Sequence, residues 1–362
     1  MSFGSLITAS RFNLLQNRIA SILGNGTSTN GYGQGLSGYG GRVSSREVSR
    51  LDESVRNIVT AENLNELYID ILRARIHQIG LENNEITPVI RNARLFPNQS
   101  LIANETSNLF NAGGEIFTDT NGVRYTSIDP DGALKGMADF ERMMTLVEVN
   151  KYDVHSSMKV SETGNSIFRV RPWDYKLIHE VIVRFRNANH RRHFFNSGGI
   201  IEMSAVLENP AGNKSLDWSQ IVATAGVVQF GHNFTTSTST DTTQPPTVLS
   251  DKGNYQLTST YDNYLDSSVL QPLYKKESRG EYSSGQYVDN SYSVSAKELS
   301  SSEIQFRMTF DDAASDSSFD TVNGTLRSQI GHVRSKGTFS NLDDIYLNVE
   351  VPAPYYEVTT IF

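Results

Sequence analysis

Cysteine is absent from all 362 residues of the chain. Its absence excludes disulfide frameworks, thiolate zinc sites, iron–sulfur clusters and cysteine nucleophiles. Basic residues are also in short supply, with 32 Lys and Arg against 40 Asp and Glu, a formal net charge of −8. Binding to nucleic acid requires a basic surface that displaces counterions. The composition therefore argues against a nucleic-acid partner.

Long apolar runs are missing as well. No stretch approaches the roughly 18 consecutive apolar residues that a membrane helix requires. The first residues lack the basic and apolar regions of a signal peptide. We therefore expect no membrane association, and synthesis in a cytoplasm that the protein leaves, if at all, as part of an assembly. At about 150 residues per domain, the length favours two domains.

An amphipathic helix is predicted for residues 8–24. Its apolar residues follow a 3-4-3 spacing, which places them on one narrow stripe of a helix. The stripe consists of Phe12, Leu15, Ile19 and Ile22. A hydroxyl at Thr8 or Ser10 can cap the start, and Gly24 can provide the positive φ of the exit.

A second helix with the same spacing is predicted from residue 60 onwards, with Leu64, Leu67 and Ile71 on its stripe. The two segments align at an offset of 52 residues without a gap, which indicates an internal repeat. Two unrelated amphipathic helices are the alternative. We expect the stripes to form a docking or oligomer surface, with the helices pairing either within one chain or between chains.

A glycine-rich segment at residues 24–41 separates the two helices. No strand precedes it and no Lys-Ser/Thr pair closes it, so it does not match a phosphate-binding loop. We interpret it as an irregular loop that contacts a neighbour through Tyr32 and Tyr39. A third helix is predicted for residues 133–150, with Met143 and Met144 as core residues rather than ligands.

The C-terminal half alternates between apolar and polar residues, the pattern of antiparallel strands with one buried face. The clearest alternation is that of Ile304, Phe306, Met308 and Phe310. Similar runs occupy residues 178–187 and 201–207, and a short helix is expected at 217–225. The predicted fold is α+β, with a helical attachment and oligomerisation region at residues 1–160 followed by an antiparallel β-sandwich domain at residues 161–362.

Two segments of this domain are expected to lie outside its core. Residues 235–252 are rich in Ser and Thr and predict a long polar loop. Pro352 and Pro354 favour an edge strand or an extended C-terminal arm. Tyr261 and Tyr264 lie in a tyrosine-rich stretch and are candidates for protein or glycan contact, with half-buried strand tyrosines as the alternative.

No catalytic constellation emerges from the motifs. His190 and His193 enclose two arginines that would repel a metal cation, so we expect a solvated or interface-facing turn there. The acidic run of Asp311, Asp312, Asp316 and Asp320 lacks the spacing of an EF-hand, which leaves a solvated loop or an irregular calcium site. We therefore predict a protein that is not an enzyme, with no catalytic residue, cofactor or metal ligand.

Several segments together resemble virion structural proteins of tailed phages, a group best represented in phages of cyanobacteria and other aquatic bacteria. The most specific segment is His-Arg-Arg-His-Phe-Phe-Asn-Ser-Gly-Gly at residues 190–199. The others are residues 7–16, 22–26, 31–34, 306–313 and 351–355. The sequence departs from the group's pattern at Ile200, where an acidic residue is expected, and the acid follows at Glu202.

The resemblance implies a virion part and carries over no active site. We expect a homo-oligomeric tail, baseplate or fibre-associated component that is assembled in the host cytoplasm with other virion structural proteins. A capsid decoration protein, an adhesin for host surface glycan and a glycan-cleaving enzyme are the alternatives.

Overall fold

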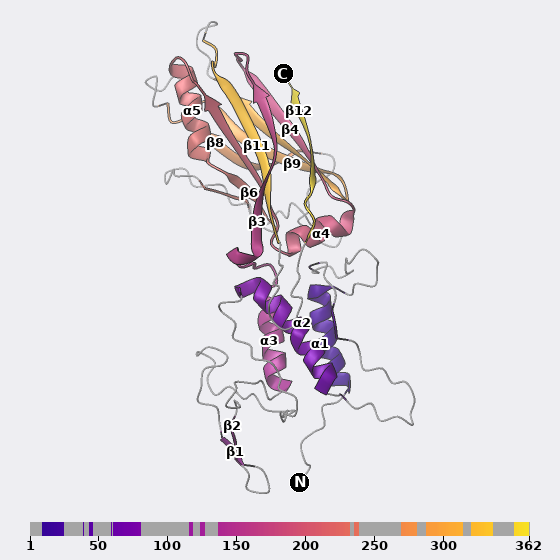
Figure 1. Ribbon diagram of the computed structural model, residues 1–362. Helices are drawn as coiled ribbons and strands as arrows, with labels where there is room; N and C mark the ends of the chain where they lie inside the picture. Colours follow the sequence, from indigo (N-terminus) through magenta and orange to yellow (C-terminus); the bar gives the residue numbers. More distant parts are fainter. Residues whose placement is uncertain are drawn as a thin grey trace. The chain divides into compact units, whose positions relative to one another are not determined.

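The computed structural model describes residues 9–24, 39, 43–45, 59, 61–80, 116–118, 124–126, 137–231, 235–238, 269–280, 287–313, 320–335 and 351–361. The chain divides into two compact units (Figure 1). Unit 1 comprises Met1–Lys159 with Ser335–Val351, and unit 2 comprises Val160–Arg334 with Pro352–Phe362. The first division lies next to the boundary expected at residue 160. The inclusion of Ser335–Val351 in unit 1 was not foreseen, because the whole C-terminal half was assigned to the sandwich.

Unit 1 contains the three predicted helices: α1 (Ala9–Leu23), α2 (Ala61–Ile79) and α3 (Met137–Val149). It also contains a two-stranded antiparallel hairpin, β1 (Ile116–Thr118) and β2 (Arg124–Thr126), and a short 3-10 helix, η1 (Ser156–Met158). Each of the three α-helices contacts the other two. Their apolar stripes form one core cluster, to which α3 adds Phe140, Met143, Met144 and Val147.

Two ion pairs set the direction of α3 against α1. Arg11 pairs with Glu141 at 2.5 Å and Arg18 with Glu148 at 2.7 Å. Both pairs join residues 130 positions apart, so the two helices run in the same direction. A step of seven residues is about two helical turns, which keeps the pairs on one side of each helix. The pairs are partly exposed, and packing of the apolar stripes rather than charge supplies most of the stability.

Unit 2 is built from two five-stranded sheets, and every strand pairing registered in the described residues of this unit is antiparallel. One sheet has the order β12 (Tyr355–Ile361), β4 (Lys176–Arg184), β10 (Glu303–Asp311), β9 (Ser291–Ser300), β8 (Gln271–Glu277). The other has the order β3 (Lys159–Arg169), β11 (Thr325–Ser335), β5 (Ile200–Glu208), β6 (Val228–Phe230), β7 (Thr235–Ser237). The α+β fold with sandwich-like antiparallel sheets is thus confirmed.

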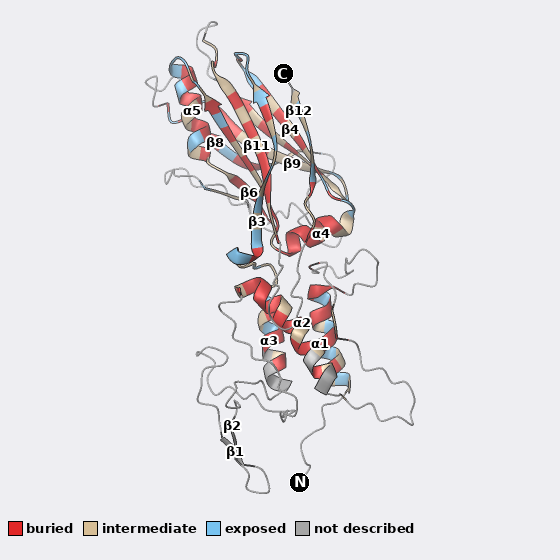
Figure 2. Cartoon of the chain, in the orientation of Figure 1, coloured by how far each residue is buried: buried red, intermediate tan, exposed pale blue. Residues whose placement is uncertain are grey.

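The sandwich core lies between the two sheets. Buried positions alternate with more exposed ones along β4 and β11 (Figure 2), and β10 alternates without interruption. Phe306 of β10 meets Phe230 of β6 with ring centres 5.2 Å apart. The Nδ1 atom of His179 and the Oγ atom of Ser328 lie 2.7 Å apart and join β4 to β11. These contacts hold the two sheets face to face.

Two further helices complete unit 2: α4 (Ala188–Asn196) and α5 (Asn213–Ala225). The latter includes the short helix predicted at 217–225, and it packs on β5, β8 and β9. Figure 1 shows α5 along one side of the sandwich.

The structure bears on both predictions for peripheral segments. Residues 235–237, the start of the predicted polar loop, form β7 and pair with β6, while 239–252 lie outside the described residues. Of the two alternatives for the C-terminal segment, the edge strand is observed and the extended arm is not, because Tyr355–Ile361 pairs with β4 along its whole length. Pro352 and Pro354 precede the paired residues, so the N–H that proline lacks costs no ladder hydrogen bond.

Candidate functional site

The His-Arg-Arg-His segment forms helix α4, not the solvated turn that we predicted. The side chain of Asn187 caps the helix by accepting the backbone N–H of His190 at 2.8 Å. His190, Arg191 and His193 are all fully buried. The buried residues of α4 combine Phe194 and Phe195 with charged and imidazole side chains. They form no apolar stripe at the helical period, which is why hydrophobic periodicity did not reveal the helix.

Both ring nitrogens of His190 are engaged. Its Nδ1 atom accepts the backbone N–H of Arg186 at 3.0 Å, so the ring is neutral and Nε2–H donates to the carbonyl of Pro352 at 2.7 Å. Burial lowers the pKa of His190, which favours this neutral form. The ring joins the start of α4 to the segment that leads into β12, and neither nitrogen is left to bind a metal.

Arg191 is an interior cation. Its Nη1 atom lies 2.8 Å from the carboxylate of Glu298 and donates to the carbonyl of Ser300 at 3.1 Å. Burial lowers the pKa of Arg191 to about 10. A guanidinium at that pKa remains charged at neutral pH, and Glu298 balances the charge. Arg191 thereby links α4 to β9.

A second interior cation, Lys214, lies in the first turn of α5. Its Nζ atom is 2.6 Å from Oδ2 of Asp312 and 3.1 Å from Oδ1 of Asp174, and it donates to the carbonyl of Asp320 at 2.6 Å. The side chain of Lys214 is 3% exposed and that of Asp312 is 0% exposed. Asp312 directly follows β10, and Asp174 lies between β3 and β4. Three remote segments therefore meet at one amine.

Two tryptophans lie next to this cluster. Trp218 donates its Nε1–H to Oδ1 of Asp312 at 3.4 Å, and the rings of Trp173 and Trp218 lie 4.9 Å apart. Burial raises the pKa of Asp312 to about 6. Burial also acts to lower the pKa of Lys214, but hydrogen bonds and charge from Asp312 and Asp174 outweigh it and leave that pKa raised.

The predicted acidic run is divided between different environments. Asp312 is inside the Lys214 cluster, Asp311 pairs with Lys176 at 3.4 Å, and the Asp320 carboxylate accepts the hydroxyl of Tyr287 at 2.5 Å. Asp316 lies outside the described residues. The interpretation of the run as one solvated loop or calcium site is therefore wrong for Asp312. The described residues contain no cluster of three or more His, Asp or Glu able to hold a metal ion.

A Tyr-His-Glu chain connects three strands of unit 2. The hydroxyl of Tyr356 lies 2.6 Å from Nδ1 of His332, whose Nε2 lies 3.1 Å from Glu162. Glu162 also pairs with Arg334 at 2.7 Å. A nucleophilic hydroxyl requires an activated oxygen, but burial raises the pKa of Tyr356. The chain is therefore best interpreted as a brace between β3, β11 and β12.

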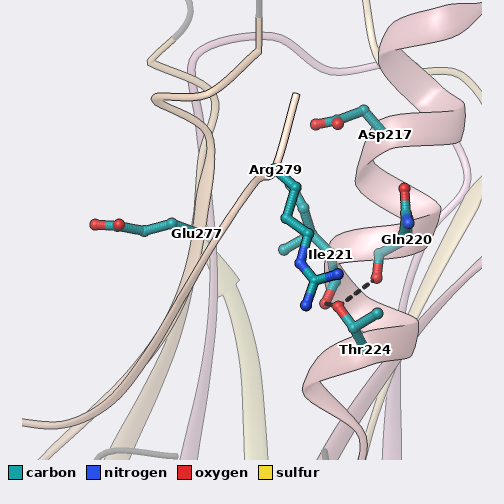
Figure 3. Close-up of a pocket in the computed structure, with 6 residues that line it drawn as sticks. All are labelled: Asp217, Gln220, Ile221, Thr224, Glu277 and Arg279. Carbon is teal, nitrogen blue, oxygen red and sulfur yellow. Dashed lines mark hydrogen bonds between the residues drawn. The ribbon is translucent and has the colours of Figure 1, made fainter. Parts of the chain in front are cut away.

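A small recess lies between α5 and the end of β8 (Figure 3). It holds about 210 Å³ of space, open solvent included, and is lined by Asp217, Gln220, Ile221, Thr224, Glu277 and Arg279. Small-molecule sites usually begin at roughly 300 Å³. Figure 3 shows the side chain of Glu277 pointing away from α5, and the Asp217 carboxylate already accepts the hydroxyl of Ser278 at 2.8 Å. The recess is a weak candidate for a ligand site.

The predicted docking stripes lie inside unit 1. Exposure is at most 3% for all seven residues, namely Phe12, Leu15, Ile19, Ile22, Leu64, Leu67 and Ile71. The helices thus pair within the chain, which removes the apolar reason for an intermolecular stripe. Tyr39, the predicted loop contact, is fully buried, and its hydroxyl accepts from Nε2 of Gln78 at 3.1 Å. Tyr32, Tyr261 and Tyr264 lie outside the described residues.

Lys214 was not predicted from the sequence, where the expected helix began at residue 217. One signal was available: a lysine in the first turn of a helix opposes the helix dipole, so it needs a compensating partner.

Within the described part of the chain, no helix is long and apolar enough to cross a membrane.

Comparison of the chain with known protein families, curated proteins and solved structures finds no match. The class of the protein therefore follows from the fold alone: an α+β chain that combines a helical unit with an antiparallel sandwich.

Proposed function

We propose that the protein is a structural component of the particle of a tailed phage, in the tail, baseplate or fibre region. The observation that carries the proposal is the contact between His190 and Pro352. These residues belong to two of the segments that resemble phage virion proteins, and they lie 162 positions apart. Two segments that carry the resemblance are therefore in direct contact in the sandwich unit.

Further residues of the resembling segments support the same interpretation. Phe194 and Phe195 are buried and pack on each other and on Phe185 with ring centres 5.0–5.8 Å apart. Phe306 and Phe310 are buried on β10. A family whose shared residues are core residues shares a fold rather than a catalytic site.

The buried charges favour a building block over a catalyst. Arg191 pairs with Glu298 and Lys214 pairs with Asp312, so the charge of each interior cation is balanced by an acid of the same chain. Such pairs fix the arrangement of the segments that they join. A part that holds its shape within a particle benefits from this arrangement.

The proposed partners are further copies of the chain and other virion proteins. Because the stripe residues are buried inside unit 1, we do not place the contacts between copies there. We propose no role for Tyr261 or Tyr264.

Quantitative mass spectrometry of purified particles tests the proposal. We expect the protein at a constant copy number per particle after repeated gradient purification, and particles from a deletion strain that are incomplete or unstable. Its loss during purification, or normal particles without the gene product, would contradict a structural role and reopen the enzyme alternative.

A further inference from the structure

The contact between Lys214 and Asp312 brings together the two groups from which an amide bond forms. A primary amine and a carboxyl group lie 2.6 Å apart, both almost fully buried. A second carboxyl group, that of Asp174, lies 3.1 Å from the same amine. We propose that Lys214 and Asp312 join covalently as an intramolecular isopeptide bond, with Asp174 as the proton carrier.

The geometry supplies proximity without any cofactor. The Nζ atom already touches Oδ2, so the carboxyl carbon is one bond beyond an existing contact. Holding two reacting groups in place converts a bimolecular step into an effectively unimolecular one. The contact also belongs to the folded state alone, because residues 214 and 312 come from α5 and from the end of β10.

The side chains of Lys214 and Asp312 are shielded from water, at 3% and 0% exposure, whereas that of Asp174 is 30% exposed. Trp173 and Trp218 are 5% and 1% exposed, and Phe310 is fully buried. Ring centres of these three residues lie 4.9–6.3 Å from one another. Condensation releases water and hydrolysis consumes it, so a dry pocket favours the amide. Burial of the ion pair also costs free energy that the neutral amide does not.

The reaction begins with a proton shift inside the cluster. The ammonium group of Lys214 gives one proton to Asp312, which leaves a neutral amine and a neutral acid with no change in total charge. The raised pKa of Asp312, about 6, favours this acceptor. The pKa of Lys214 is also raised, so the neutral pair is the minor form and we expect slow bond formation after folding.

The bond-forming step balances without an oxidant or reductant. The lone pair of Nζ attacks the carboxyl carbon of Asp312, and a C–N bond forms. The Asp174 carboxylate removes a proton from the nitrogen and delivers it to the departing hydroxyl group. The C–O bond breaks, one water leaves and Asp174 returns to its carboxylate form.

The bond would provide a covalent cross-link in a chain without cysteine. It closes a loop from residue 214 to residue 312, which contains the rest of α5 and the strands β6, β7, β8, β9 and β10. Unlike a disulfide, an amide does not respond to the redox state of its surroundings. This modification does not depend on whether the protein belongs to a virion.

Mass spectrometry of the intact, denatured, full-length protein tests the proposal. The expected mass is lower than that of the sequence by one water molecule, and a tryptic digest should contain one branched peptide that joins the Lys214 and Asp312 segments. A mass equal to that of the sequence, with Lys214 cleaved by trypsin as usual, would overturn it.

Substitutions show which residues lose the water molecule. Lys214→Arg keeps the charge and the ion pair but removes the amine nucleophile, and Asp312→Ala removes the acyl group, so both should show the full mass of their sequences. Loss of water that persists in Lys214→Arg would arise elsewhere and would also overturn the proposal. Lys275→Arg is the matched control, because Lys275 pairs with Glu277 at the same 2.6 Å distance but with both side chains more than half exposed. It should lose one water as the wild type does.

Asp174→Asn tests the proton carrier. General acid–base catalysis typically contributes roughly 100-fold or more, so the variant should lose water at least about 100-fold more slowly while the Lys214–Asp312 contact remains. An unchanged rate would remove Asp174 from the mechanism.

Discussion

Leu14 and Leu15 are neighbours in α1, yet Leu14 is 60% exposed and Leu15 is 1% exposed. The difference follows from helical geometry, since adjacent residues point about 100° apart around the axis. Leu15 lies in the core cluster with residues of α2 and α3. Leu14 faces away from that cluster.

This pair provides a matched test of unit 1. Leu15→Ala should lower the free energy of unfolding by about 2–5 kcal/mol, because truncation of a buried leucine to alanine typically costs this much. Leu14→Ala should change it by less than about 0.5 kcal/mol. The helical circular dichroism signal during urea unfolding reports both values. Equal effects of the two substitutions would contradict the core placement of the stripe.

His190→Leu should loosen the C-terminal strand. The substitution leaves the carbonyl of Pro352 and the N–H of Arg186 without their ring partner, and each unpaired buried group costs about 1–3 kcal/mol. His190→Gln, whose amide can still donate, should cost less. Hydrogen exchange of β12 amides is the measurement. Protection of β12 that is unchanged in His190→Leu would show that the contact does not hold the strand.

Gly199 should tolerate no side chain. A Cβ atom there would lie 2.3 Å from the carbonyl oxygen of Phe194, whereas a Cβ at Gly212 meets nothing within 4 Å. Gly199→Ala should therefore destabilise the sandwich by about 2 kcal/mol or more. Gly212→Ala makes no such clash, so its cost should come from backbone strain alone, about 1–3 kcal/mol, at a φ of 89° and a ψ of 161°. Thermal unfolding measures both variants, and a loss below about 0.5 kcal/mol in Gly199→Ala would contradict the packing.

Acid should weaken the sandwich through His179. This residue is fully buried, and burial lowers its pKa to about 4, against roughly 6.5 in an unfolded chain. Between those values the unfolded state binds more protons, so the free energy of unfolding falls as pH falls from 6.5 towards 4, by up to about 3 kcal/mol.

The non-titrating variant His179→Asn isolates this contribution. An asparagine can still bond to Ser328, and the remaining titratable groups are common to both proteins. Urea unfolding between pH 7 and pH 4 should show a shallower loss for His179→Asn than for the wild type. Parallel curves would assign the acid sensitivity to other groups.

The sequence predicted the elements whose burial repeats at a simple period. The alternation of Phe306 and Met308 predicted β10, and the spacing of Leu64, Leu67 and Ile71 predicted α2. Helix α4 was missed because Arg191 and two histidines are buried in it alongside its two phenylalanines, so its apolar residues do not repeat at the helical period. Periodicity detects apolar faces, and it cannot detect a buried face made of paired charges.

The Lys214 cluster was equally beyond local patterns. Lys214 and Asp312 are 98 positions apart, and their contact depends on how α5 meets the end of β10. Only the tertiary structure establishes that neighbourhood. The same limit applied to the stripes, since the spacing of Leu15 and Leu67 predicted a buried face but not whether the partner lay in the same chain.

Labelling of intact particles with antibody against the recombinant protein, viewed by electron microscopy, tests the virion assignment most directly. We expect label on the tail, at the baseplate or on the fibres, in particles that remain intact. Label confined to the head would select a capsid decoration protein instead. Particles without any label, in a preparation whose denatured protein the antibody does not detect either, would contradict a structural role in the virion.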